Sequence, residues 1–292
     1  MKPASFEYYA PRSLSEALEQ ISQVGDDGGK ILAGGQSLVP AMNFRMAQPT
    51  ALVDLNRISE LFYINPTDSG GLMIGAMTRD RVVELDENVK LRAPMIPECL
   101  HWMAHPTIRN RGTFGGALAH SDPAGQLPVV AAALQFNFKL QSKKAERWVN
   151  ADEFFVSVYT TCLEADEILT AIEVPALGKH SGTSFQQVSR QSGESALVGI
   201  ATLISLDEAG KIKDGRIAYM GVAEKPVMAS AAMDMLMGNK PSDELIADAI
   251  KATVSSELDP GADIHASVEY RLHLAQALGV KAVKEAVARA AK

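Results

Sequence analysis

The order of the strands and helices that the sequence predicts changes once along the chain, and this change constrains the fold most. Up to residue 174, short apolar strands alternate with helical patterns. After residue 183 the pattern is different: three strand-like runs come first (184–189, 196–206, 212–222), and three helical patterns follow (227–237, 243–255 and from 268). Consecutive strands followed by helices indicate an antiparallel meander in an α+β module.

The stretch PALGKHSG at residues 175–182 is the best linker candidate, since turn-forming residues lie on both sides of a charge. The chain has 292 residues, a length that suggests two domains. A chain this long can bury a large core without disulfides or a structural metal. We therefore expect two domains that meet near this linker.

Composition excludes several classes of protein. The net charge is −7 and no dense basic run occurs, so we expect no nucleic-acid partner. The apolar stretch 196–206 is too short to span a bilayer, and the first thirteen residues lack the apolar core of a signal peptide. Cys99 and Cys162 form no CxxC motif, which argues against an iron–sulfur cluster or zinc finger held by this chain alone. We expect a soluble, cytoplasmic protein without membrane insertion.

The first segment that can carry chemistry follows strand 30–33 and reads LAGGQSL at residues 32–38. Two glycines let the backbone turn sharply and bring its N–H groups together, and such a row of donors binds phosphate without a side-chain cation. The segment is neither GxxxxGK[ST] nor GxGxxG, so it is not a Walker or Rossmann motif. On these residues alone, a structural turn and a binding loop both remain open.

The second segment reads GTFGGALAHSDP at residues 112–123 and contains another pair of glycines. Thr113, His120, Ser121 and Asp122 supply donors and acceptors that suit ribose hydroxyls and a polar ring edge. Two polar Gly-Gly loops without lysine favour a large cofactor with a diphosphate over two structural turns. We therefore predict a dinucleotide site that both segments share.

Other residues carry weaker signals. His101, His105 and His120 lack the spacing of a zinc protease site, so we expect no metal. Arg109 and Arg111 flank the second segment, where they could neutralise a phosphate or simply face solvent. No GxSxG motif is present, and neither cysteine has the sequence context of a nucleophile. We assign no catalytic residue.

The two motifs together resemble a known family. AGGQSLVPAMNFRM near the start and HPTIRNRGTFGGALAHSDPAGQLP some 70 residues later are similar to the FAD-binding medium subunits of the molybdenum hydroxylases. These include carbon monoxide dehydrogenase and bacterial xanthine dehydrogenase. The resemblance covers nearly the whole chain. It implies an α+β fold with a two-lobed PCMH-type FAD-binding domain at 1–177 and, at 178–292, a C-terminal domain of an antiparallel sheet with three helices.

The resemblance also implies which residues bind FAD. In the family the first loop wraps the diphosphate, and the second motif and an aliphatic residue of DEILT complete the site. Carried over to this sequence, the binding residues are Lys30 at the rim, Ala33, Gly34, Gly35, Gln36, Ser37, Leu38, Thr113, Gly115, Gly116, His120, Asp122 and Leu169.

The function implied is that of the FAD-carrying, electron-transferring subunit of a heterotrimeric molybdenum hydroxylase. In this family a large subunit holds the molybdenum cofactor, a small subunit holds [2Fe–2S] clusters, and two heterotrimers usually associate. We expect non-covalent FAD, because Gln36 and Ser37 stand where self-contained flavin oxidases carry a linking His or Cys. The alternative hypothesis is that the chain is itself such an oxidase, of the vanillyl-alcohol-oxidase-like class. A second alternative is an interaction scaffold that has kept the fold and lost the flavin.

Two positions depart from the family pattern. Where several relatives place an aromatic residue beside the flavin, this chain reads GESA at 193–196, so Ser195 takes that position. Gln126 replaces a residue that is often acidic. The sequence thus leaves open the electron acceptor, which is NAD, a quinone, O₂ or a carrier protein in this family. It also leaves open the substrate, an N-heterocycle, a purine or carbon monoxide.

Overall fold

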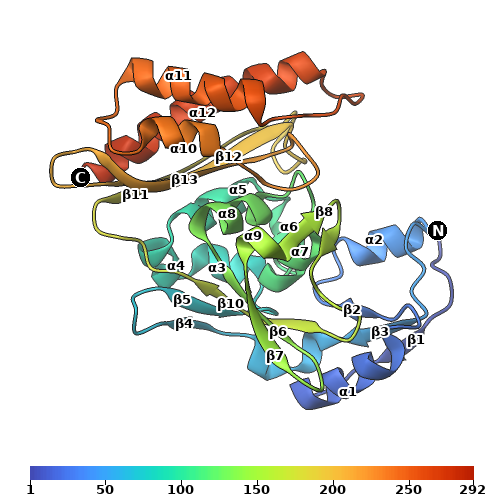
Figure 1. Cartoon of the computed structure of the whole chain (residues 1–292). Helices are drawn as coiled ribbons and strands as arrows, with labels where there is room; N and C mark the ends of the chain where they lie inside the picture. The colour runs from blue at the N-terminus through green and yellow to red at the C-terminus, as the bar shows by residue number, and fades with distance from the viewer.

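The N-terminal strands form a small parallel sheet in the order β1-β3-β2, far from the C-terminal helices (Figure 1). The structure is a computed structural model that describes residues 1–292. Ser13 caps the first helix through its hydroxyl, which accepts the Glu16 N–H at 3.2 Å. The elements here are β1 (Glu7–Tyr9), α1 (Leu14–Val24), β2 (Lys30–Leu32), α2 (Leu38–Asn43), β3 (Ala51–Asp54) and the 3₁₀ turns Leu55–Arg57 and Ser59–Leu61.

A five-stranded antiparallel sheet follows, in the order β4-β5-β10-β6-β7. Six helices connect β5 to β6 and cover one side of this sheet (Figure 1). Its strands are β4 (Ile64–Pro66), β5 (Leu72–Gly75), β6 (Asn137–Gln141), β7 (Glu146–Asn150) and β10 (Ile168–Val174). The helices are α3 (Asp80–Leu85), α4 (Glu87–Arg92), α5 (Met95–Trp102), α6 (Pro106–Arg109), α7 (Phe114–His120) and α8 (Gln126–Leu134). Between β7 and β10 lie α9 (Ala151–Phe154) and the hairpin β8 (Phe155–Ser157) and β9 (Thr160–Thr161).

The C-terminal part, which here means everything from β11 onward, is the predicted meander followed by helices. Its antiparallel sheet has the order β11-β12-β13-β14, with β11 (Ser181–Val188), β12 (Val198–Leu206), β13 (Ile212–Met220) and β14 (Val227–Met228). The helices are α10 (Ser230–Leu236), α11 (Asp243–Ser256) and α12 (Val268–Ala290). One expectation needs correction: residues 227–228 pair with β13 as a short edge strand instead of starting a helix, so the helix begins at Ser230.

Strand β12 is buried on both faces. Ala201 belongs to the core of the N-terminal part, around helices α5 and α8, whereas Ile200 and Ile204 belong to a second core under α10–α12. Because side chains alternate between the faces of a strand, burial on both faces requires an apolar residue at almost every position. This explains the nearly continuous apolar run at 196–206. The C-terminal sheet therefore forms a layer between two sets of helices (Figure 1).

A membrane-spanning helix would have to be long and apolar along its whole length. None of the helices of this structure has both properties.

Candidate functional site

The first Gly-Gly segment forms the turn between β2 and α2. The backbone N–H groups of Gly34, Gly35, Gln36, Ser37 and Leu38 donate no hydrogen bond within the protein. Gly35 has a φ of +74°, in the left-handed region that favours glycine, and residues 33–36 are half-buried. Five neighbouring donors without partners form a cradle for an anion such as a diphosphate.

The second Gly-Gly segment is built differently, because its donors are already used. Thr113 caps α7, and its hydroxyl accepts the Gly116 N–H at 3.1 Å. The N–H groups of Phe114 and Gly115 donate to the carbonyls of Thr78 and Ala76, each at 2.9 Å. A Cβ on Gly115 would lie 2.5 Å from the Cβ of Ala76, so this glycine permits close packing of α7 on the segment after β5.

The two segments contact each other through their glycines. A Cβ on Gly34 would lie 2.4 Å from the carbonyl oxygen of Arg111, and one on Gly116 would lie 3.2 Å from the Cβ of Ala33. Residues about 80 positions apart in the sequence therefore share one wall. This arrangement fits FAD: the first loop offers the free donors, and the second segment supports that loop from behind.

His120 and Asp122 follow at the end of α7. The His120 ring stacks on the Tyr159 ring, with centroids 4.9 Å apart and an angle of 28° between the planes. Burial lowers the pKa of His120 despite the opposing charge of Asp122, so the imidazole is neutral at pH 7. The Asp122 carboxylate accepts the Ala124 N–H at 2.9 Å. The left-handed Ser121, at φ +49°, makes the turn between them.

Two residues of the expected set, Leu169 and Lys30, lie outside the two Gly-Gly segments. Leu169 is buried in β10, at a bulge beside Thr170, whose carbonyl accepts the N–H of Ala76 at 3.0 Å. This hydrogen bond joins the backbone of β10 to the segment after β5, on which Gly115 packs. Lys30 is exposed at the start of β2 and forms no ion pair.

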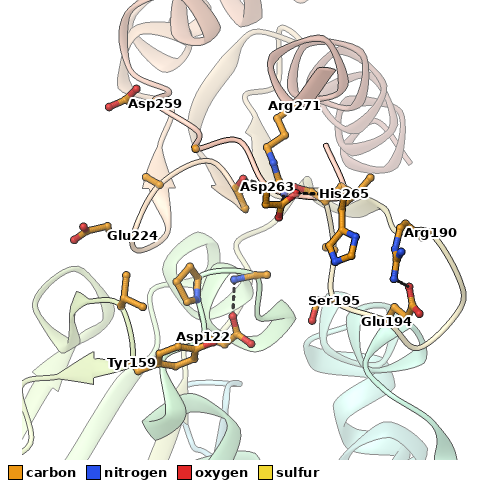
Figure 2. Close-up of a pocket in the computed structure, with 18 residues that line it drawn as sticks. Asp122, Tyr159, Arg190, Glu194, Ser195, Glu224, Asp259, Asp263, His265 and Arg271 are labelled. Carbon is orange, nitrogen blue, oxygen red and sulfur yellow. Dashed lines mark hydrogen bonds and ion pairs between the residues drawn. The ribbon is translucent and has the colours of Figure 1, made fainter. Parts of the chain in front are cut away.

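A cavity of about 540 Å³ opens beside Asp122, and Ser195 lines it as well (Figure 2). Its walls come from the turn after α7, from Tyr159, and from three loops of the C-terminal part. Sequence reasoning named Asp122 and Ser195 separately, and the structure brings them to one space. It did not single out Tyr159 or Arg271, because exposure and stacking leave no local sequence signal.

Arg109 neither neutralises a phosphate nor faces solvent, the two roles that the sequence left open. Arg109 is 4% exposed, and its guanidinium donates to Glu84 at 2.9 Å and to the carbonyls of Met103 and Ala104 at 2.8 Å. A diphosphate at the first loop therefore cannot use this charge. Burial raises the pKa of the neighbouring Asp80 to about 7, in spite of the opposing effect of Arg109.

Comparison with known proteins agrees with this geometry. Residues 4–177 match the family "FAD binding domain in molybdopterin dehydrogenase", and residues 183–286 match "CO dehydrogenase flavoprotein C-terminal domain". The chain is 38% identical to the 6-hydroxypseudooxynicotine dehydrogenase complex subunit alpha of Paenarthrobacter nicotinovorans, over 99% of this chain and 97% of that protein.

Solved structures give the same result. Carbon monoxide dehydrogenase from Hydrogenophaga pseudoflava matches with a TM-score of 0.94 and 36% identity over 99% of each chain. Quinoline 2-oxidoreductase from Pseudomonas putida 86 matches with a TM-score of 0.93 and 36% identity over 100% of each chain. The chain therefore belongs to the FAD-binding medium subunits of the molybdenum hydroxylases, a family of oxidoreductases.

Proposed function

We propose that this chain is the FAD-carrying, electron-transferring subunit of a heterotrimeric molybdenum hydroxylase. In the proposed complex a large subunit carries the molybdenum cofactor, and a small subunit passes electrons from its [2Fe–2S] clusters to the FAD held here. The observation that carries the proposal is the row of free N–H groups from Gly34 to Leu38, which rests on Arg111 and Gly112. Bound FAD supplies the redox chemistry, and this chain binds, orients and encloses it.

The binding residues fall into three groups. The first loop holds the diphosphate through its backbone. The turn after α7 contributes Asp122, with the neutral His120 behind it, and β10 contributes an apolar contact. The full proposed set is Lys30, Ala33, Gly34, Gly35, Gln36, Ser37, Leu38, Thr113, Gly115, Gly116, His120, Asp122 and Leu169. Neither Gln36 nor Ser37 forms a covalent flavin bond, so the FAD is held non-covalently.

We further propose that the FAD-binding domain comprises residues 1–177 and the C-terminal domain residues 178–292. The family matches support this division, since one ends at residue 177 and the next begins at 183. The complex is proposed to be a cytoplasmic dimer of heterotrimers. Relatives named as medium chains, such as that of carbon monoxide dehydrogenase from Hydrogenophaga pseudoflava, support the multi-subunit assembly.

A substitution at Gly35 tests the first loop. Gly35→Asp places a carboxylate where the diphosphate is proposed to bind, so we expect FAD to be lost. Gly35→Asn is the matched control: it causes the same backbone strain at φ +74° without the charge, and it should retain much more FAD. The measurement is the amount of FAD that acid precipitation releases from each purified protein. Equal FAD in the Asp variant and the parent, or flavin that stays on the precipitated chain, would contradict the proposal.

A further inference from the structure

Two side chains that belong to neither glycine motif, Asn56 and Arg79, join the two segments. Asn56 lies in the 3₁₀ turn after β3, and its amide donates to the Ala33 carbonyl, at the start of the first loop, at 2.8 Å. Arg79 lies just before α3, and its guanidinium donates to the Asn56 amide oxygen and to the Arg111 carbonyl, each at 2.7 Å. Gly34 packs against the same Arg111 carbonyl. The two side chains therefore connect the first loop to the segment that supports it.

Both side chains are held in one orientation. The NH₂ group of Asn56 faces two acceptors, the Ala33 carbonyl and the Asp54 carboxylate, and its oxygen faces the guanidinium of Arg79, which can only donate. Arg79 is fixed through its backbone, which forms an antiparallel β-bridge with Thr113. Because these partners come from different elements, the pair keeps the first loop in one conformation, and this lowers the entropy that a ligand must offset on binding.

Arg79 also carries a positive charge that no carboxylate neutralises. It is half-buried and forms no ion pair, and its hydrogen-bond acceptors are two uncharged oxygens. The guanidinium lies over the Phe62 ring, 5.5 Å from its centroid. Burial and the nearby charge of Arg111 lower the pKa of Arg79, and the carboxylates of Asp80 and Asp54 offset this only in part. A guanidinium in such surroundings is stabilised by an anion close to it.

From these observations we propose that Asn56 and Arg79 are positioning residues of the diphosphate site. Both hold the first loop in its anion-binding conformation, and Arg79 also supplies the positive charge that the loop lacks. The proposal rests on the FAD-binding function proposed above. The loop Gly34–Leu38 contains no lysine or arginine, and the charge of Arg109 is already neutralised by Glu84. Asn56 acts through the backbone of the loop, whereas Arg79 acts through the backbone and through its charge.

Two variants separate the two roles. Asn56→Ala removes the hydrogen bonds and keeps the charge of Arg79, so FAD should bind about fivefold more weakly at every salt concentration. Arg79→Gln removes the charge as well, so FAD should bind about tenfold more weakly at low salt, and this deficit should shrink as salt is added. The measurement is the Kd of FAD, from the change in flavin fluorescence when the flavin-free full chain is titrated.

The two variants can each contradict one role. Asn56→Ala that binds FAD as tightly as the parent would show that the hydrogen bonds do not hold the loop. A deficit of Arg79→Gln that is the same at low and high salt would show that its charge does not act on the diphosphate, because loss of packing alone is not screened by salt.

Arg79→Lys separates the charge from the hydrogen bonds at one position. Lysine keeps the charge but lacks the planar fork that reaches both oxygens. At low salt this variant should bind FAD more tightly than Arg79→Gln and less tightly than the parent, and its deficit should not depend on salt. Equal affinities of the lysine and glutamine variants would refute the role of the charge. This milder change also keeps the test open if Arg79→Gln does not fold.

Arg12→Gln is the matched control for net charge. Arg12 is an exposed arginine before α1 that forms no ion pair, so its variant should bind FAD like the parent. A deficit as large as that of Arg79→Gln would overturn the assignment to Arg79. The Kd of the parent is measured first. A parent that binds no FAD overturns the proposed function as well, whereas a parent that binds FAD no better than the Asn56 and Arg79 variants overturns only their positioning roles.

Discussion

At the scale of single residues, the least expected feature is the buried cluster behind the second glycine segment. Asp80 is 2% exposed, and its Oδ1 has no hydrogen-bond partner. A Cβ on Gly112 would lie 2.2 Å from Asp80 Oδ2, so this carboxylate lies directly beneath the segment that supports the first loop. Burial is the main reason that its pKa rises to about 7.

The pKa of Asp80 predicts a pH-dependent stability. In the unfolded chain an aspartate titrates near pH 4, so between about pH 4 and pH 7 the folded protein binds the extra proton. Asp80 therefore makes its full contribution to stability below about pH 4, and this contribution is lost as the pH rises toward 7. Asp80→Asn does not titrate, so it should gain stability relative to the parent as the pH rises, up to about pH 7.

Urea unfolding at about pH 5 and about pH 8 measures this effect as the difference in the free energy of unfolding between variant and parent. Asp234→Asn, a change at an exposed carboxylate without an ion pair, is the control and should show the same small difference at both pH values. If the Asp80→Asn difference is also the same at both values, the carboxyl does not titrate in this range.

At the scale of elements, the second glycine pair has a packing role that its sequence did not reveal. The N–H groups of Gly115 and Gly116 donate to partners within the protein. What their missing side chains allow is contact of α7 with Ala76 on one side and Ala33 on the other. Whether they also contact FAD stays a prediction.

A glycine-to-alanine pair tests the packing role. Gly115→Ala should lower the free energy of unfolding by about 1–3 kcal/mol even without flavin, because the new methyl group would overlap the Ala76 Cβ. Gly261→Ala is the matched change: a Cβ there meets no atom within 4 Å, so its effect should stay within about 0.5 kcal/mol. Denaturant unfolding of the flavin-free proteins measures both. If the flavin-free Gly115→Ala protein is as stable as the parent, the contact between α7 and Ala76 accommodates a methyl group without cost.

At the scale of the whole molecule, polar contacts join the two parts of the chain. Gln126 donates to Gln187 at 3.1 Å between buried side chains, and Arg289 on α12 reaches Glu98 on α5 at 2.6 Å. These contacts hold the C-terminal part against α5 and α8. At Gln126, where relatives often have an acidic residue, the side chain donates to the Gln187 amide oxygen instead of pairing with a cation.

The whole-molecule prediction concerns incompleteness. The chain has two cysteines, Cys99 and Cys162, whereas the four protein ligands of a [2Fe–2S] cluster are cysteine thiolates. We therefore expect the isolated, FAD-loaded chain to accept electrons from dithionite but to oxidise no N-heterocycle, purine or carbon monoxide. Bleaching of the flavin absorbance and assays with each substrate measure this. Substrate oxidation by the chain alone would favour the self-contained oxidase.

Mass spectrometry of the native complex then tests the assembly. Two further subunit types should co-purify with this chain, and the identity of the large one would indicate the substrate. A native extract that contains only the monomer would contradict the proposed heterotrimer.

What the sequence determined by itself is local. Three helices begin at a serine whose side chain accepts the N–H three residues later, namely Ser13, Ser242 and Ser267. The burial of strand β12 follows from its own apolar run. The glycine motifs also carried the family resemblance. In each case the interaction, or the pattern that reveals it, spans only a few residues.

The tertiary structure decided everything that depends on which distant groups meet. Arg109 became a buried partner of Glu84, not a phosphate ligand, because α3 and α6 pack together. The same holds for the contact of Gly34 with Arg111 and for the cavity that both Asp122 and Arg271 line. The role of a charged side chain depends on how deeply it is buried and on which group it pairs with. Long-range packing determines the burial and the partner, so no short sequence pattern encodes that role.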